Sequence, residues 1–148
     1  METVGLLPLV EIIRGDDFTE TLTFEYTDIV EDNQGVEYEV NLPYDLTIYD
    51  NIVMDVRRKS KEDSDVVLTL ELGSGLTVTN TNKLIIHIDH TNSNNFGGDY
   101  YQFTSPITTL QSSKYYYRDI RFVKDNVVTT LLKGTYKVKH NITKINAL

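Results

Sequence analysis

The chain has 148 residues and contains neither cysteine nor tryptophan. Without cysteine it has no disulfide scaffold, no thiol nucleophile and no thiolate metal site. No apolar run approaches the roughly 18 residues that a membrane-spanning helix needs. The first ten residues lack the basic start of a signal peptide, and Pro8 interrupts their apolar run, so they are interpreted as an arm or a first strand. We therefore expect a chain that folds around its own core and has no membrane partner.

Alanine, the best helix-forming residue, occurs only once, at Ala147. By contrast, valine, isoleucine, threonine, phenylalanine and tyrosine together make up 59 of the 148 residues. These residue types fit the pleated surface of a sheet. Hydrophobic residues are 40% and charged residues 24% of the chain, as in globular proteins. The composition and length predict an all-β fold with little helix in a single domain.

Short segments of alternating apolar and polar residues are separated by turn signals, which is typical of an antiparallel sandwich or barrel. In the segment 18–26, apolar residues and Glu20 share one face, while threonines occupy most of the other. Gly134 is expected to separate the last two strands. The expected strands number about nine or ten and cover residues 9–13, 18–26, 36–42, 52–58, 66–72, 76–79, 84–89, 115–123, 127–132 and 135–142.

Acidic and basic residues are distributed unevenly along the chain. Residues 1–65 carry 17 acids and 5 bases, whereas residues 66–148 carry 5 acids and 9 bases. In one interpretation, acidic and basic strands interleave in one sandwich and neutralise one another. In the other, one end of the molecule is acidic and the other basic, which favours head-to-tail contacts between subunits. The net charge of −8 argues against a nucleic-acid partner, because phosphate neutralisation needs a concentrated basic surface.

No catalytic constellation or cofactor motif is recognisable in the sequence. His87 and His90 could supply metal ligands, but no further ligand is implied nearby, so surface histidines are expected. No nucleophile elbow, phosphate-binding glycine loop or dinucleotide fingerprint is present. Nothing singles out two carboxylates as the pair of a glycoside hydrolase, and a hydrolase would need two of them in a shared cleft. We therefore expect no enzymatic activity, no cofactor and no metal.

Tyrosines form two clusters, at residues 100–101 and 115–117. Adjacent residues of a strand point to opposite faces, so one ring is expected in the core and its neighbour at an interface. An exposed aromatic platform would instead favour a carbohydrate-binding module for host attachment, which is the alternative function. The lack of tryptophan makes that alternative weaker.

Three short motifs are interpreted as local structure. In the R-G-D sequence that begins at Arg14, Gly15 is expected to adopt a positive φ, and either Asp16 or Asp17 is expected to accept hydrogen bonds from nearby backbone amides. The acidic residues at 28–33 lack the ligand spacing of a calcium-binding loop and are interpreted as a solvated turn. The sequon at residues 141–143 has meaning only in a eukaryotic secretory context.

Three longer motifs follow one another along the chain. They are R-G-D-D-F at residues 14–18, Y-D-L-T at residues 44–47, and T-T-L-L-K-G-T-Y-K-V at residues 129–138. Their order and spacing resemble those of small virion proteins of tailed bacteriophages, including the N-terminal domain of baseplate upper proteins. In that family the motifs frame an immunoglobulin-like β-sandwich, so the resemblance implies this fold here. One departure is Arg118, which interrupts the family's Tyr-Asp pair in the penultimate strand.

The resemblance implies a non-enzymatic building block of the virion that contacts other virion proteins in a homo- or hetero-oligomer. Residues 1–8 are expected to form an N-terminal arm that adds to a neighbour's sheet edge, and residues 9–148 a single sandwich domain. The basic residues near the C-terminus would suit an acidic patch on a partner. The interface candidates are therefore Leu6, Leu7, Leu9, Lys133, Lys137, Lys139 and Lys144. Capsid, neck, baseplate and fibre attachment all remain open as positions in the particle.

Overall fold

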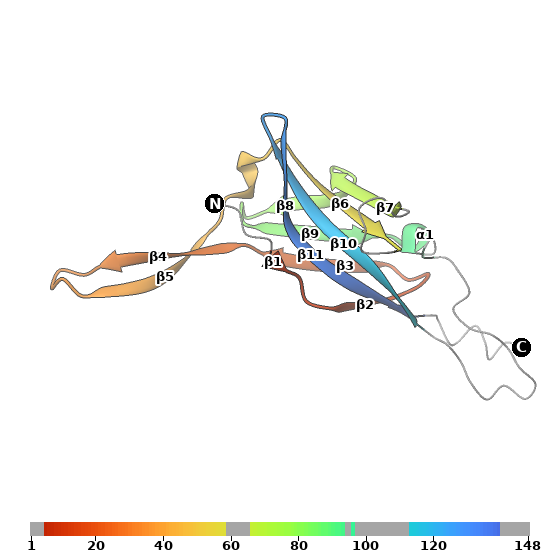
Figure 1. Ribbon diagram of the computed structural model, residues 1–148, viewed down its shortest axis with the longest axis horizontal. Coiled ribbons are helices and arrows are strands. Elements are labelled where there is room, and N and C mark those ends of the chain that lie inside the picture. Colours follow the sequence, from red (N-terminus) through yellow and green to blue (C-terminus); the bar gives the residue numbers. More distant parts are fainter. Residues whose placement is uncertain (1–4, 59–65, 94–95, 97–112, 140–148) are drawn as a thin grey trace, which may run out of the picture.

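The computed structural model describes residues 5–58, 66–93, 96 and 113–139, and these residues are mostly in β-strands (Figure 1). The strands are Gly5–Leu6 (β1), Val10–Ile13 (β2), Phe18–Thr23 (β3), Glu25–Glu31 (β4), Glu37–Pro43 (β5), Asn51–Arg57 (β6), Val66–Leu72 (β7), Gly75–Thr79 (β8), Lys83–Ile88 (β9), Ser113–Lys124 (β10) and Val127–Lys139 (β11). The helical elements are a 3-10 turn at Leu46–Ile48 (η1) and one α-helical turn at His90–Ser93 (α1). The prediction of an all-β fold with little helix is confirmed.

Nine strands form one sheet, while β4 pairs only with β5 in a separate two-stranded sheet. The strand order of the large sheet is β1-β11-β10-β6-β7-β8-β9-β3, and β2 also pairs with β11. The pairs β1–β11, β2–β11 and β7–β8 are parallel, and the others are antiparallel. The pairing is therefore mixed where a fully antiparallel one was expected, because the N-terminal segment runs alongside β11 in the same direction.

The large sheet curls so that β3, at one end of the strand order, packs across the core against β11 near the other end. The ring of Phe18 on β3 lies edge-on to that of Tyr136 on β11, with the ring centroids 5.7 Å apart. Alternate residues of each strand point inward, and in β10 these buried residues are Tyr116, Arg118, Ile120 and Phe122. The result is a sandwich-like arrangement around one apolar core.

β11 continues through Gly134 to Lys139, so the predicted strand break at this glycine is wrong. The register of β10 and β11 shifts between Ile120 and Arg121 instead, which marks a β-bulge. A Cβ atom on Gly134 would lie only 2.7 Å from the Cβ of Leu7. The glycine is therefore required by the close approach of the N-terminal segment to β11 and not by a turn.

The N-terminal segment lies on the chain's own sheet. β1 pairs in parallel with β11, where Leu6 lies opposite Lys133. The amide of Leu7 then donates a 2.7 Å hydrogen bond to the carbonyl of Lys133. The end of the expected arm over residues 1–8 thus pairs with β11 of the same molecule, whereas the sequence predicted that the arm adds to a neighbour's sheet edge. The first part of that expected arm lies outside the described residues.

The hairpin of β4 and β5, residues 25–43, is called the ribbon below. It projects from the body of the molecule, to the left in Figure 1. Its strands pair in register from Glu25 opposite Pro43 to Glu31 opposite Glu37. At its tip, the carboxylate of Asp32 accepts hydrogen bonds of 2.8 and 2.9 Å from two backbone amides of the turn. Every side chain of the two strands is exposed or half-buried.

Candidate functional site

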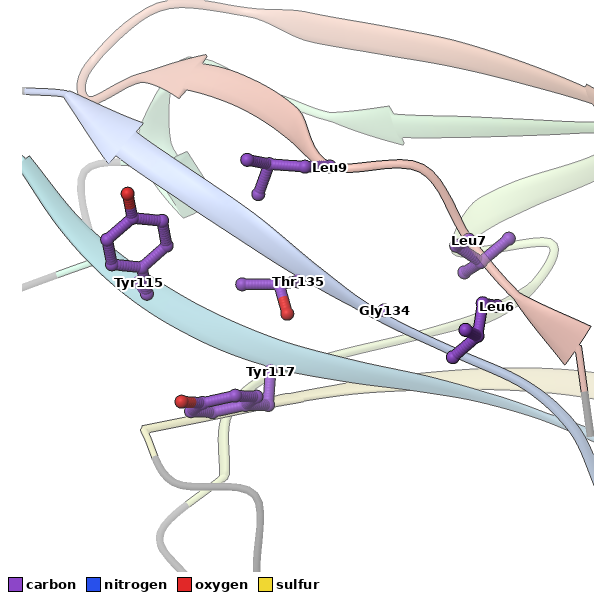
Figure 2. Close-up of a pocket in the computed structure, with 7 residues that line it drawn as sticks. All are labelled: Leu6, Leu7, Leu9, Tyr115, Tyr117, Gly134 and Thr135. Carbon is purple, nitrogen blue, oxygen red and sulfur yellow. The ribbon is translucent and has the colours of Figure 1, made fainter.

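An open groove lies where the N-terminal segment runs beside β11 and β10 (Figure 2). Its volume is about 460 Å³, and it is lined by Leu6, Leu7, Leu9, Tyr115, Tyr117, Gly134 and Thr135. The lining is mostly apolar, and the exposed fractions are 89% for Leu6, 57% for Leu9 and 52% for Tyr115. Contiguous apolar surface of this kind is typical of a site where another molecule docks.

The tyrosines at residues 115–117 divide between the two faces of β10. Tyr116 is buried, with 2% of its surface exposed. Tyr115 and Tyr117 line the groove on the outer face, on the same strand (Figure 2). The predicted division of these rings between core and surface is confirmed. The same alternation places Arg118 on the inner face of β10, where it is 2% exposed.

Three of the lysines predicted at an interface lie on β11, the strand that forms the floor of the groove. The ammonium groups of Lys137 and Lys139 lie 3.9 and 3.0 Å from the carboxylate of Glu11, which offsets part of their charge. Lys133 is exposed on the same strand. The leucines and lysines selected from the sequence therefore occupy neighbouring positions in the fold. Lys144, the last of these candidates, lies outside the described residues.

The ribbon has one apolar face and one polar face. According to the strand register, the apolar face carries Tyr26, Asp28, Val30, Tyr38, Val40 and Leu42. The polar face carries Glu25, Thr27, Ile29, Glu31, Glu37, Glu39, Asn41 and Pro43. Such alternation is typical of a sheet with one buried face. Here Tyr26 and Tyr38 nevertheless remain 47% and 50% exposed, while Val30, Val40 and Leu42 are half-buried, so the apolar face is partly open to solvent.

The ribbon is also strongly acidic. Residues 25–43 contain six aspartates and glutamates and no lysine, arginine or histidine. Glu31 and Glu37 lie directly opposite each other near the tip, an unfavourable arrangement for like charges. A projecting element with charge of one sign attracts a surface of the opposite sign.

A buried ion pair joins β10 to β3 across the core. Arg118 on β10 is 2% exposed and donates hydrogen bonds of 2.5 and 3.0 Å to the two carboxylate oxygens of Glu20 on β3. It also donates a 2.6 Å hydrogen bond to the hydroxyl of Tyr136, whose pKa is raised by burial. Nη2 of Arg118, which donates one of the hydrogen bonds to Glu20, also lies 3.4 Å from the carbonyl oxygen of Pro8. The network therefore also supports the N-terminal segment that lines the groove.

Two carboxylates meet on the outer face of the sheet, where Asp55 of β6 lies opposite Asp119 of β10. One oxygen of Asp55 pairs with Arg121 and, at 3.1 Å, with Arg57. The other accepts a 2.8 Å hydrogen bond from the Thr69 hydroxyl. Burial raises the pKa of Asp119, and the nearby Arg121 opposes this shift only in part. Because Asp55 is engaged by two arginines, the cluster resembles a structural network more than the acid and base of a hydrolase.

His87 and His90 have separate partners. Nδ1 of His87 lies 3.0 Å from the hydroxyl of Thr19, and Nδ1 of His90 lies 3.2 Å from the carboxylate of Asp17. The backbone amide of His90 also donates a 2.6 Å hydrogen bond to Asp17, and together these bonds hold the pKa of Asp17 below its usual value. Among the described residues, no group of three side chains could hold a metal ion.

The R-G-D sequence forms the turn between β2 and β3. Gly15 adopts a φ of +90°, which confirms the predicted positive φ. Its amide donates a 2.9 Å hydrogen bond to the hydroxyl of Ser93, which in turn donates one of 2.7 Å to the carbonyl of Asp16. The buried Ser93 therefore fixes this turn against α1. The prediction that an aspartate here accepts backbone hydrogen bonds is also confirmed, by Asp17.

Some predicted features lie elsewhere. The tyrosines at residues 100–101 and the sequon at residues 141–143 lie outside the described residues. The acidic segment at residues 28–33 covers the end of β4 and the start of the tip of the ribbon. In the described part of the chain, no helix is long and apolar enough to span a membrane.

Two features were not expected from the sequence, namely the projection of the ribbon and the pairing of Arg118 with Glu20. The second had a signal, because each residue interrupts an otherwise apolar face of an alternating segment. The sequence contained no signal for the projection of the ribbon, because alternation predicts two strands but not their position relative to the core.

Comparison with known proteins assigns no family. No protein-family model matches the chain, and no curated protein matches it. The resemblance to virion proteins of tailed bacteriophages therefore stays a prediction that depends on three sequence motifs.

Proposed function

We propose that this chain is a structural subunit of a tailed-bacteriophage virion, which acts through protein–protein contacts and catalyses no reaction. The observation that carries the proposal is the ribbon, which extends from the body (Figure 1). Tyr26 and Tyr38 on its apolar face remain about half exposed. An isolated two-stranded hairpin is only marginally stable in water. Covering this face with a neighbouring subunit gains about 25 cal/mol for each Å² of apolar surface removed from water. Such an element suits a protein whose working state is an assembly.

The groove supports the same proposal. It combines exposed apolar side chains with lysines on the strand that forms its floor. Protein interfaces commonly have an apolar centre and a polar or charged rim. With the ribbon and the groove on different elements, one subunit can contact two neighbours at once.

The polar clusters also favour a structural role. Asp55 and Asp119 are the carboxylates that best match the pair a hydrolase would need, since they are opposite each other across two strands. Asp55 already pairs with two arginines and a threonine hydroxyl. Glu20, the other strongly engaged carboxylate, is paired with Arg118 in the core. These carboxylates stabilise the sheet and are poorly placed to act on a substrate.

The test is the composition of purified particles. Phage particles encoding this chain should contain it in a fixed ratio to their major capsid protein, measured by quantitative mass spectrometry after density-gradient purification. An unrelated host protein of similar abundance in the lysate serves as the control for carry-over. If the chain is absent from the particles, or no more enriched than that control, the proposal is wrong.

A carbohydrate-binding module is the second candidate, because Tyr115 and Tyr117 expose their rings on one face of β10, with 52% and 38% of their surfaces accessible. A glycan array should be probed with the chain and with the double variant Tyr115→Thr, Tyr117→Thr. A glycan bound by the first and lost by the second would support this candidate, and the absence of any binding above background would remove it.

A further inference from the structure

The ribbon and the groove are complementary in polarity. The ribbon presents five apolar side chains on one face, with Asp28 as the single polar residue among them. The groove presents two leucines and two tyrosines that are 38% to 89% exposed, namely Leu6, Leu9, Tyr115 and Tyr117. Each surface on its own exposes apolar area to water, and contact between the two would remove both exposures at once.

The two surfaces are also complementary in charge. The ribbon carries six acids and no base over residues 25–43. Beside the groove, Lys133, Lys137 and Lys139 lie on β11, with Glu11 near the last two and Asp119 opposite Lys133. Asp28 lies on the apolar face of the ribbon and four of its glutamates lie on the polar face, so pairing two ribbons through their apolar faces would bring two strongly acidic elements close together, which costs free energy. Charge therefore favours contact of a ribbon with a groove over contact between ribbons.

The positions of the two surfaces exclude contact within one molecule. The ribbon extends away from the body, whereas β1, β2 and β11, which border the groove, lie on the body itself (Figure 1). The tip of the ribbon thus points away from its own groove. A ribbon seated in this groove must therefore belong to another copy, and each molecule in such a pair keeps one surface free.

We propose that this chain assembles head to tail, with the apolar face of one copy's ribbon seated in the groove of a second copy. The proposal rests on the proposed function as a structural subunit and names the partner as the chain itself. Tyr26 and Tyr38 are the apolar anchors on the ribbon side, and Tyr115 and Leu9 are those on the groove side. The contact joins two different surfaces, so it is heterologous, and it extends into a ring or an open chain of subunits.

The first measurement is sedimentation velocity of the full chain over a range of concentrations. The expected result is a series of species larger than the monomer that grows with concentration. Raising the salt concentration from about 0.05 M to about 0.5 M should weaken association, since screening shortens the reach of the lysine–carboxylate attraction. A chain that stays monomeric at the highest attainable concentration in low salt would overturn the proposal.

Two double variants test the ribbon and the groove separately. Tyr26→Thr with Tyr38→Thr disables the ribbon, and Tyr115→Thr with Tyr117→Thr disables the groove. Threonine, like tyrosine, favours β-strands, so the sheets are retained. Each variant alone should raise the dissociation constant at least about tenfold, as expected for loss of buried tyrosine anchors.

Mixing the two variants gives the sharpest outcome. The ribbon variant retains an intact groove, and the groove variant retains an intact ribbon. Together they should form a one-to-one dimer that cannot grow further. If the mixture stays monomeric while the wild type associates, or if only the ribbon variant loses association, the contact is not ribbon to groove and the proposal is wrong.

The matched control replaces Val127 and Val128 with threonine at the β10–β11 turn, where they are 64% and 56% exposed and outside both surfaces. This variant should associate like the wild type. Circular dichroism melting of all variants checks that the body remains folded. A monomeric chain that is nevertheless enriched in particles would reject self-assembly while leaving the structural role intact, whereas a self-associating chain missing from particles would reject the virion role alone.

Discussion

Strand β10 and the ribbon show the same sequence pattern with opposite outcomes. In β10 the inward residues Tyr116, Ile120 and Phe122 are at most 2% exposed. In the ribbon the equivalent apolar residues Tyr26 and Tyr38 are about half exposed, at 47% and 50%. Alternation therefore predicts that one face of a strand is apolar and tends to be buried. It does not predict whether the residues that bury this face belong to the same molecule.

The two regions also differ in how their charged side chains are paired. β10 contains a buried arginine, Arg118, which satisfies its charge with Glu20 and with the hydroxyl of Tyr136. The acids of the ribbon lie on exposed strands that contain no basic residue. The body should consequently be sensitive to the loss of one charge, whereas changes in the ribbon should leave the stability of the body intact.

The largest effect is expected from Arg118→Met. It leaves Glu20 without its partner in the core, which should lower the free energy of unfolding by about 3–5 kcal/mol. Adding Glu20→Leu should restore most of that loss, because an apolar pair replaces a broken ion pair. Urea denaturation measures all three proteins, with the exposed Arg58→Met as the control, which should stay within about 0.5 kcal/mol of wild type. Equal stability of Arg118→Met and the control would contradict the role given to the pair.

The next effect is expected from Gly134→Ala. Its methyl group would lie 2.7 Å from the Cβ of Leu7, so the N-terminal segment must shift. Overpacking of this kind costs about 1–3 kcal/mol. In a Leu7→Gly background, which removes the clashing atom, the same substitution should cost clearly less in thermal unfolding. Equal costs in both backgrounds would show that the close approach does not require the glycine.

Shortening the ribbon should have a smaller effect on the body. Replacing residues 29–39 with Asn-Gly joins the paired residues Asp28 and Val40 through a two-residue turn. Because the core lies elsewhere, the free energy of unfolding should change by less than about 1 kcal/mol. In the wild type, hydrogen exchange should be faster for ribbon amides than for those of β10. A large loss of stability on shortening would mean that the ribbon supports the body.

The smallest effect is expected from Asp17→Asn. The pKa of Asp17 is lowered in the folded state by its hydrogen bonds from His90. Its contribution to stability is therefore present above the unfolded pKa of about 3.9 and is lost as the pH falls through the folded value. The variant should melt slightly below the wild type at pH 7, and the difference should shrink as the pH is lowered below about 3.9. A difference that grows at low pH would refute this reasoning.

Much of the body could be predicted from the sequence. The segment 66–72 is a strand with the predicted bounds, and Gly15 has the predicted positive φ. These features depend on residues close in the sequence, where alternation and backbone sterics act directly. Gly134 shows the limit, because the reason for this glycine is Leu7, a residue far away in the chain. The groove could not be predicted from local pattern either, because the residues that line it come from both ends of the sequence.

The sequence by itself determined the all-β class, most of the strand segments and the acidic character of residues 25–43. Composition and alternation are properties of the sequence itself, so they do not depend on how distant parts of the chain pack together. Only the tertiary structure decided that β1 lies on β11, that Arg118 meets Glu20 and that the ribbon leaves the body. These outcomes depend on which distant surfaces meet, because burial and charge pairing act between neighbours in space.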